Sequence, residues 1–151
     1  MKKIVLALSL FAFVGFTTIS CNNDDDNNTT FVELNTLPTA ARDFVGNYFP
    51  GVEILNIEKY SPAKENGAMY EVNFRNGSDA EFDTSGNWIS VEASGNNTIP
   101  TGFILPSIVS YVSNNYPNQG INQIEIKNGG FEVELTNDVD LHFDSNGNFI
   151  R

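Results

Sequence analysis

Two near copies of one short stretch, FDTSGNW at residues 82–88 and FDSNGNF at residues 143–149, stand 61 positions apart in the chain. The sequence around them repeats as well. YEVNFRNGSDAEFDTSGNWIS, which begins at Tyr70, aligns without a gap with FEVELTNDVDLHFDSNGNFIR, which begins at Phe131. Such internal similarity is the mark of a duplicated supersecondary unit, so both halves are expected to fold alike.

Each copy opens with a segment that has the apolar period of a helix. Apolar side chains recur at helical spacing along LPTAARDFVGNYFP (37–50), and LPSIVSYVSNNYP (105–117) repeats this stripe with one residue fewer. Pro38 and Pro106 stand where a first-turn proline is tolerated, and a second proline closes each segment. We therefore expect one helix in each copy.

The remainder of each copy alternates apolar and polar residues, as strands do. The predicted strands of the first copy are 52–60, 69–75, 79–83 and 88–92, and their counterparts are 121–127, 131–136, 140–144 and 149–151. The expected fold class is α+β, with two tandem repeats that each consist of one helix followed by a four-stranded antiparallel sheet. Because a unit of this size is marginal alone, the two repeats should pack together, with their sheets joined or side by side.

The duplicated stretch itself is typical of a hairpin turn. Asp83 and Asp144 suit the first position of a type I turn, where the carboxylate accepts hydrogen bonds from the turn's own amides. Gly86 and Gly147 would supply the positive φ of the bulge that follows. The flanking aromatic residues, such as Phe82 and Trp88, should then face each other across the hairpin.

The N-terminal sequence MKKIVLALSLFAFVGFTTISC has the pattern of a secretory signal. Cys21 is the only cysteine, and TTISC resembles the lipobox of bacterial lipoproteins, which predicts lipidation of Cys21. NNDDDNNTT, which follows, has no apolar residue to bury. The expected organisation is a lipoprotein signal peptide (1–20), a disordered acidic tether (21–33), a first repeat (34–92), a linker (93–102) and a second repeat (103–151).

The charge of the chain argues against nucleic acid as a partner. The formal net charge is −11, and it becomes −13 when the signal peptide takes Lys2 and Lys3 with it. Such a surface repels nucleic acid and anionic lipid, whereas a cationic partner or a divalent cation is electrostatically easier to bind. The membrane is expected to be contacted through the N-terminal lipid only.

The residues that could carry chemistry are few, and no enzyme is expected. His142 is the only histidine, so a zinc site or a Cys–His pair is not predicted. The duplicated turn fails the EF-hand pattern, although a looser calcium site could be formed by Asp79, Glu81, Asp83, Asp140 and Asp144. A solvated polar sheet face is the alternative interpretation of these carboxylates, and no other cofactor is expected.

Two features could contact a partner. The loop SPAKENGA (61–68), with Lys64 and Glu65, is longer than its counterpart KNGG (127–130) and is the clearest asymmetry between the copies. Ile89 and Val91 would fall on the face opposite Trp88, which is otherwise acidic. The carboxylates expected to point away from the helices are Glu71, Asp79, Glu81, Asp83, Glu132, Glu134, Asp140 and Asp144.

The pattern LP-x-x-A-x-x-F…YFP…YEVNF-x-NG-x-x-x-x-FD-x-x-G-x-W resembles the PepSY-like, β-lactamase-inhibitor-like family of small exported proteins of Gram-negative bacteria. The second copy departs from it, with Phe149 in place of tryptophan. The resemblance implies a helix-plus-sheet repeat used in tandem, without known catalytic residues, and some relatives are described as calcium-regulated.

The function expected from the sequence is a non-enzymatic binding module, anchored in the envelope, that recognises a protein or peptide, with a peptidase-inhibitor type of role as a specific version. A calcium-responsive periplasmic structural or sensor protein is the alternative. The expected location is the outer membrane, as a lipoprotein that faces the periplasm or the cell surface.

Overall fold

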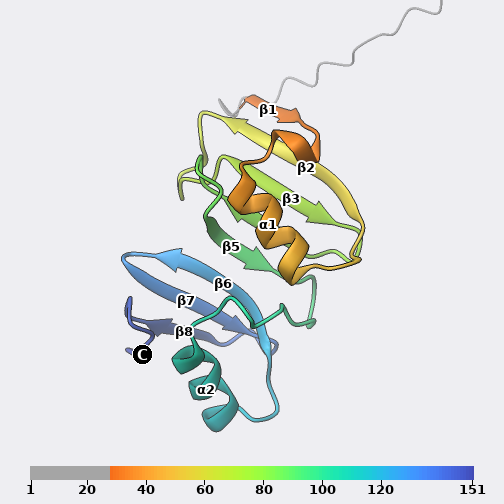
Figure 1. The fold of residues 1–151 in the computed structure, drawn as a ribbon. Helices are drawn as coiled ribbons and strands as arrows, with labels where there is room; N and C mark the ends of the chain where they lie inside the picture. Colours follow the sequence, from red (N-terminus) through yellow and green to blue (C-terminus); the bar gives the residue numbers. More distant parts are fainter. Residues whose placement is uncertain (1–27) are drawn as a thin grey trace, which may run out of the picture.

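The computed structural model describes residues 28–151 (Figure 1). The predicted signal peptide, the lipidation site Cys21 and residues 22–27 of the predicted tether lie outside the described residues. The elements in chain order are β1 (Asn28–Phe31), a 3₁₀ turn η1 (Leu34–Thr36), α1 (Thr39–Tyr48), β2 (Ile54–Ser61), β3 (Tyr70–Phe74), β4 (Asp79–Phe82), β5 (Trp88–Glu92), α2 (Pro106–Asn115), β6 (Ile121–Lys127), β7 (Gly130–Leu135) and β8 (Asp140–Phe143).

The strands form a single antiparallel sheet of eight strands, whose order in space is their order in the chain (Figure 1). β5 of the first copy pairs with β6 of the second copy, with Val91 opposite Ile124. The α+β class is confirmed, but two separate four-stranded sheets do not form. One joined sheet leaves two exposed edges, whereas two separate sheets would leave four edges with unpaired backbone groups.

The predicted fourth strand of the second copy, residues 149–151, does not form a regular strand. It is reduced to an isolated bridge between Phe143 and Phe149. Two further backbone hydrogen bonds hold it against β8, from Ile150 N–H to the His142 carbonyl and from His142 N–H to the Arg151 carbonyl. Three residues offer too few pairings for a ladder, so the prediction of a full strand here is wrong.

β1 lies within the segment that was predicted to be a disordered tether, and that prediction is wrong for Asn28–Phe31. The strand pairs antiparallel with β2, from Asn28 opposite Ser61 to Phe31 opposite Glu58. All of its residues are exposed. The composition argument failed because it asked only whether side chains could be buried, whereas an edge strand is held through backbone N–H and C=O groups.

Both helices cover the same face of the sheet and share one core with it (Figure 1). On α1 the ring of Phe44 meets Phe82 edge-on at 5.5 Å, and on α2 Tyr111 meets Phe143 in the same way at 5.5 Å. Beneath the helices runs a cross-strand row of buried apolar residues, the central row, which consists of Ile57, Val72, Ala80, Val91, Ile124, Val133 and Leu141.

The segment 93–102 between β5 and α2 has no helix or strand, yet one side chain anchors it firmly. The amide nitrogen of Asn122 in β6 donates to the carbonyls of Ala93, Gly95 and Asn97 at 2.7–2.8 Å. Asn122 is buried, and an unsatisfied amide would be costly there. These three bonds therefore hold the connection against the sheet where the two halves join.

The duplicated turns adopt the predicted conformation in both halves. Asp83 accepts from the N–H groups of Ser85 and Asn87 at 2.8 and 2.9 Å, and Asp144 accepts from Asn146 and Asn148 at 2.9 and 2.8 Å. The Asn87 and Asn148 side chains each donate to the second carboxylate oxygen. The carboxylates are therefore used to close the turns.

The turn glycines have a second role that only the structure reveals. Gly86 has φ +87° and Gly147 has φ +77°. A Cβ on Gly86 would lie 2.8 Å from the Ala41 nitrogen and from Pro38 Cβ, and a Cβ on Gly147 would collide with Ser107 at the start of α2. Each turn is thus seated against the N-terminal end of the helix of its own half.

We predict that Gly86→Ala lowers the free energy of unfolding by about 2–5 kcal/mol, because the left-handed φ costs about 1–2 kcal/mol and overpacking adds about 1–3 kcal/mol. Gly129→Ala is the matched control: Gly129 has φ +79° but open space around its Cβ position, so only the first cost applies. Urea unfolding of both variants measures the difference. Equal losses would show that contact with the helix end contributes nothing.

Candidate functional site: a carboxylate-lined sheet face

The face of the sheet opposite the helices carries two cross-strand rows of polar side chains, one on each side of the central row. The first, the lysine-balanced row, consists of Glu58, Glu71, Glu81, Ser90, Glu125, Glu132 and His142. The second, the open acidic row, consists of Asn56, Asn73, Asp79, Glu92, Gln123, Glu134 and Asp140. Strand pleating places both rows on this face. This was predicted for Glu71, Asp79, Glu81, Glu132, Glu134 and Asp140, but not for Glu58, Glu92 and Glu125.

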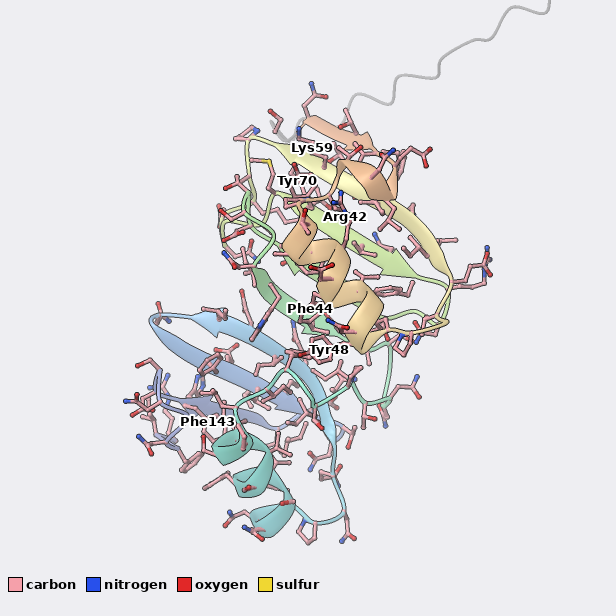
Figure 2. The ribbon with its side chains drawn as sticks, in the orientation of Figure 1. Arg42, Phe44, Tyr48, Lys59, Tyr70 and Phe143 are labelled. Carbon is pink, nitrogen blue, oxygen red and sulfur yellow. The ribbon has the colours of Figure 1, made fainter. Side chains whose placement is uncertain are left out.

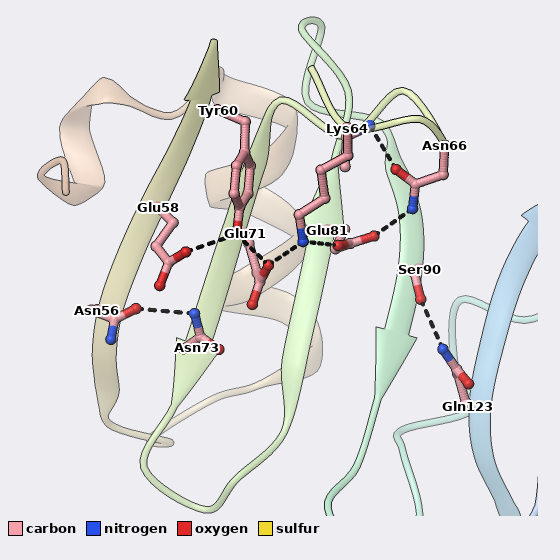
Figure 3. A network of polar contacts seen from close by, with 11 residues as sticks. Asn56, Glu58, Tyr60, Lys64, Asn66, Glu71, Asn73, Glu81, Ser90 and Gln123 are labelled. Carbon is pink, nitrogen blue, oxygen red and sulfur yellow. Dashed lines mark hydrogen bonds and ion pairs between the residues drawn. The ribbon is translucent and has the colours of Figure 1, made fainter. Parts of the chain in front are cut away.

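In the first half, the loop 61–68 reaches over the lysine-balanced row (Figure 3). The Lys64 ammonium donates to Glu71 and to Glu81 at 2.5 Å each, and it lies 4.4 Å from the centre of the Tyr60 ring. Asn66 donates to the other oxygen of Glu81 at 2.7 Å. The loop that the sequence marked as an asymmetry therefore neutralises the sheet face of its own chain.

Tyr60, on β2, contacts two carboxylates of the same row. Its hydroxyl lies 2.7 Å from a carboxylate oxygen of Glu58 and from one of Glu71, and it can donate to one of them at a time (Figure 3). Burial and the two carboxylates raise the pKa of the Tyr60 hydroxyl, so it stays protonated. Burial alone would raise the pKa of Glu71, but the hydrogen bonds from Lys64 and Tyr60 outweigh it and lower that pKa.

The second half neutralises the same row differently. Asn128, with φ +54°, and Gly129 form a tight turn, so no long loop covers the strands. Lys127 takes the place of Tyr60 in the register, and its ammonium lies 3.4 Å from Glu125 and 3.2 Å from Glu132. Where the first half has Glu81, this half has His142, whose Nδ1 lies 3.4 Å from Glu132.

The open acidic row has no such counter-charges. Among residues 28–151, its carboxylates Asp79, Glu92, Glu134 and Asp140 form no ion pair. Burial, together with Glu71, Glu92 and Glu81, raises the pKa of Asp79 to about 7. Burial and the neighbouring Asp140, Asp138 and Glu92 raise the pKa of Glu134. The row is therefore a line of mutually repelling carboxylates that crosses the junction of the two halves.

The calcium candidates are not brought together into one site. Within residues 28–151 no group of three or more His, Cys, Asp or Glu side chains is arranged to hold a metal ion. Asp83 and Asp144 close their own turns, and Glu81 binds Lys64 and Asn66. Asp79 and Asp140 lie in the open acidic row, on β4 and β8, with β5, β6 and β7 between them.

The residues that were predicted to contact a partner lie in different environments. Lys64 is engaged within the chain, whereas Glu65 is exposed. Ile89 is half-buried beneath the loop, near Gly67. Val91 is fully buried in the central row, so its prediction as an outer-face contact is wrong.

A bulge explains the error at Val91. Glu81 pairs with Ser90 and Phe82 pairs with Trp88, which leaves Ile89 as the extra residue. Trp88 and Val91 can therefore both face the core, where strict alternation would put them on opposite faces. The Trp88 ring faces Phe82 in register as predicted, but it packs on Phe103 at 5.2 Å.

Several residues of this face were missed in the sequence. Tyr60 was treated only as part of a strand, Asn66 only as part of a loop, and Glu92 only as the end of β5. Glu92 becomes significant only when β5 is aligned after the bulge, and Tyr60 and Asn66 only when their side chains are placed beside Glu71 and Glu81. Such pairings between strands cannot be read from the period of a single strand.

No helix within residues 28–151 has the length and apolar character needed to cross a membrane.

Comparisons with known proteins agree with this architecture. The model of the family described as "Putative beta-lactamase-inhibitor-like, PepSY-like" matches residues 68–151, which is more than half of the chain. A search of curated proteins found no match. Neither the family description nor the names of the three solved structures below designate a catalytic activity.

Three solved structures share the fold. A putative calcium-regulated periplasmic protein from Bacteroides thetaiotaomicron is 29% identical with a TM-score of 0.73, and the match covers 82% of this chain and 94% of that one. A putative periplasmic protein of the DUF2874 family from Bacteroides vulgatus is 29% identical, with a TM-score of 0.71 and coverage of 85% and 98%. A second putative periplasmic protein from Bacteroides vulgatus, of unknown function, is 28% identical, with a TM-score of 0.72 and coverage of 83% and 97%.

We predict that Lys64→Met lowers the free energy of unfolding by about 1–2 kcal/mol, because it leaves two largely buried carboxylates without a counter-charge. The side chains of Glu71 and Glu81 are only 17% and 11% exposed. Lys127→Met removes the same charge from the second half, where the lysine is 46% exposed, and should cost at most about 1 kcal/mol. The denaturant midpoints of the two variants measure these losses. A larger loss for Lys127→Met than for Lys64→Met would show that Lys64 is not the more important counter-charge.

We also predict a pH dependence at Asp79. Its folded pKa, about 7, lies above the unfolded value of about 3.9. Between these two values folded Asp79 retains a proton that the unfolded chain releases. The contribution of Asp79 to the free energy of unfolding is therefore most favourable below about pH 4 and is lost as the pH rises through 7.

Asp79→Asn should remove this loss. The difference in the free energy of unfolding between the variant and the parent should grow by about 1–2 kcal/mol in favour of the variant as the pH rises from 5 to 8. Solvent screening of the partly exposed carboxyl keeps the value this small. Asp43→Asn, on the exposed side of α1, is the control. A gain that does not change with pH would refute the raised pKa.

Proposed function

This chain belongs to the PepSY-like, β-lactamase-inhibitor-like family, and on that premise we propose that it is a non-enzymatic binding module of the bacterial envelope. Its binding surface is the helix-free face of the sheet, and its ligand is a cationic segment of a protein or peptide. The names of the solved neighbours, which describe them as putative periplasmic proteins, support export. A lipid on Cys21 anchors the module in the outer membrane.

The open acidic row is the observation that carries this proposal. Its carboxylates repel one another because no counter-charge lies between them. A positively charged ligand would remove this repulsion, and the free energy released would favour binding. Asp79, Glu92 and Glu134 lie on β4, β5 and β7, so the row runs in a line across the strands. A ligand with several positive charges along its length matches this geometry.

The lysine-balanced row supports the choice of ligand chemistry. Lys64 lies against Glu71 and Glu81 with its ammonium close to the face of the Tyr60 ring. The chain's own side chain therefore demonstrates that a primary ammonium fits this face. An inhibitor-type role, as the family name suggests, would require binding of the same general kind, with a peptidase or another envelope enzyme as the partner.

A lysine-rich peptide tests the proposal directly. The triple variant Asp79→Asn/Glu92→Gln/Glu134→Gln should bind a fluorescent decalysine at least about tenfold more weakly than the parent, since each ion pair with a carboxylate of the row contributes up to about 1 kcal/mol. The measurement is fluorescence anisotropy at physiological salt, where exposed charges are screened beyond about 8 Å.

A second triple variant separates the row from overall charge. Glu33→Gln/Asp43→Asn/Glu65→Gln removes the same number of carboxyl groups from exposed positions outside the row. It should change the affinity by no more than about twofold to threefold, because the lost charges are distant and screened. Equal weakening by both triple variants would mean that the peptide senses only net charge, and the proposed surface would be rejected.

A calcium-responsive role is the second candidate, and the name of the neighbour from Bacteroides thetaiotaomicron favours it. The carboxylates of the open acidic row are the place where a hard cation would be attracted. Melting of the parent and of the first triple variant, with calcium and with chelator, separates the candidates. A calcium-dependent rise in melting temperature that the triple variant loses would support calcium over a peptide.

A further inference from the structure

Exposed apolar side chains gather at the edge of the sheet where the described chain begins. Phe31, Leu34 and Leu55 are 72%, 43% and 55% exposed. Together with neighbouring residues of β1, η1 and β2 they line one hollow of about 360 Å³. Apolar groups that share one exposed hollow indicate a surface that is covered by something else. We refer to this edge as the β1 pole.

Two positive side chains without carboxylate partners lie at the same pole. Lys59 is opposite Thr30 of β1 in the register, and Arg42 lines a second hollow together with Leu34. Arg42 donates to backbone carbonyls and to the Thr39 hydroxyl, and among residues 28–151 neither cation forms an ion pair. Figure 2 shows Lys59 beside β1 and Arg42 at the upper end of α1.

Elsewhere on the described chain, Lys64, Arg75 and Lys127 are each held by carboxylates. The β1 pole therefore combines exposed apolar groups with two cations that no carboxylate pairs, a combination that recurs on the described chain where Arg151 lies beside Ile150 at the opposite edge of the sheet. Glu33 lines both hollows and is the carboxylate at their rim. Apolar side chains flanked by basic ones are the combination that binds the interface of a lipid bilayer.

The length of chain before β1 brings this pole close to a membrane. Cys21 precedes Asn28 by seven residues, which span at most roughly 25 Å when fully extended. β8 lies seven strand spacings from β1, which is roughly 34 Å at about 4.8 Å for each spacing. A lipid on Cys21 therefore holds the β1 edge nearer to the bilayer than the β8 edge. This step rests on the lipid anchor of the proposed function.

We infer that the β1 pole docks on the bilayer surface. Phe31, Leu34 and Leu55 enter the interface, and Arg42 and Lys59 meet lipid phosphates. The docked domain stands with β1 at the membrane and β8 away from it, so that the helix-free face is presented sideways to a ligand. The domain thereby adds a second contact to the single lipid anchor and fixes the orientation of the binding surface.

The experiment uses the full lipidated chain in vesicles of phosphatidylethanolamine with a minor share of phosphatidylglycerol. Because Cys21 is the only cysteine and carries the lipid, Leu55→Cys and Ile150→Cys each introduce one thiol for an environment-sensitive fluorophore. Ile150 is the matched control, since it is exposed and lies beside β8 at the far edge. Quenching by spin-labelled lipid reports the distance of each fluorophore from the bilayer.

The fluorophore at position 55 should be quenched at least twofold more strongly than the one at position 150. Phe31→Ser/Leu34→Ser, both at exposed positions, should reduce quenching at position 55 by at least about half while the melting temperature stays unchanged, because only the lipid tether then keeps this edge near the bilayer. Equal quenching at both positions in the parent would overturn the inference. Unchanged quenching at position 55 in the Phe31→Ser/Leu34→Ser variant would also overturn it. In a separate measurement, Leu55→Cys is labelled with pyrene. Excimer emission from this label would also overturn the inference, because it would show that a second copy of the chain covers the pole.

Failure of the anchor is detected separately. Mass spectrometry of the membrane-extracted chain shows whether Cys21 carries lipid, with Cys21→Ala as the unlipidated control. A chain without lipid would remove the anchor and with it this inference, yet the peptide-binding measurement on the sheet face would be unaffected. A lipidated chain with equal quenching at both positions would reject docking alone.

Discussion

The central row of buried apolar side chains is the constraint on which the other features depend. Each of its members pairs directly with the next across seven strands, from Ile57 on β2 to Leu141 on β8. Side chains alternate between the two faces, so a slip of one residue would expose the whole row. Once this row is buried under α1 and α2, the residues on either side of it must face away from the helices, which creates both rows of the candidate site.

The bulge at Ile89 allows the row to cross from one half to the other. The extra residue lets Trp88 pack on Phe103 while Val91 takes its place opposite Ile124. Without it, β5 would present Val91 to solvent and could not continue the core into β6. Asn122 supports the same junction, because its three hydrogen bonds hold the segment that connects β5 to α2.

The parts of the fold that follow from local chemistry could be predicted from the sequence. The helices, the turns at Asp83 and Asp144, and the alternation of β3 depend on neighbours in the chain. The pairing of β5 with β6, the edge strand β1 and the burial of Val91 depend on contacts between distant segments. For the same reason the carboxylates could be placed on one face, but their division into a neutralised row and an open row could not.

The two halves balance the charge of the sheet face differently, and the open acidic row also contains uncharged positions. Glu71 and Glu81 of the first half require Lys64, whereas in the second half His142 replaces the second carboxylate and Lys127 suffices. Within the open row, amides stand at Asn56, Asn73 and Gln123, so the sheet accepts uncharged side chains at such positions. The raised pKa of Asp79 shows that its charge has a cost in the folded protein. Under the proposed function, these carboxylates are kept at a cost in stability because they bind a ligand that carries positive charge.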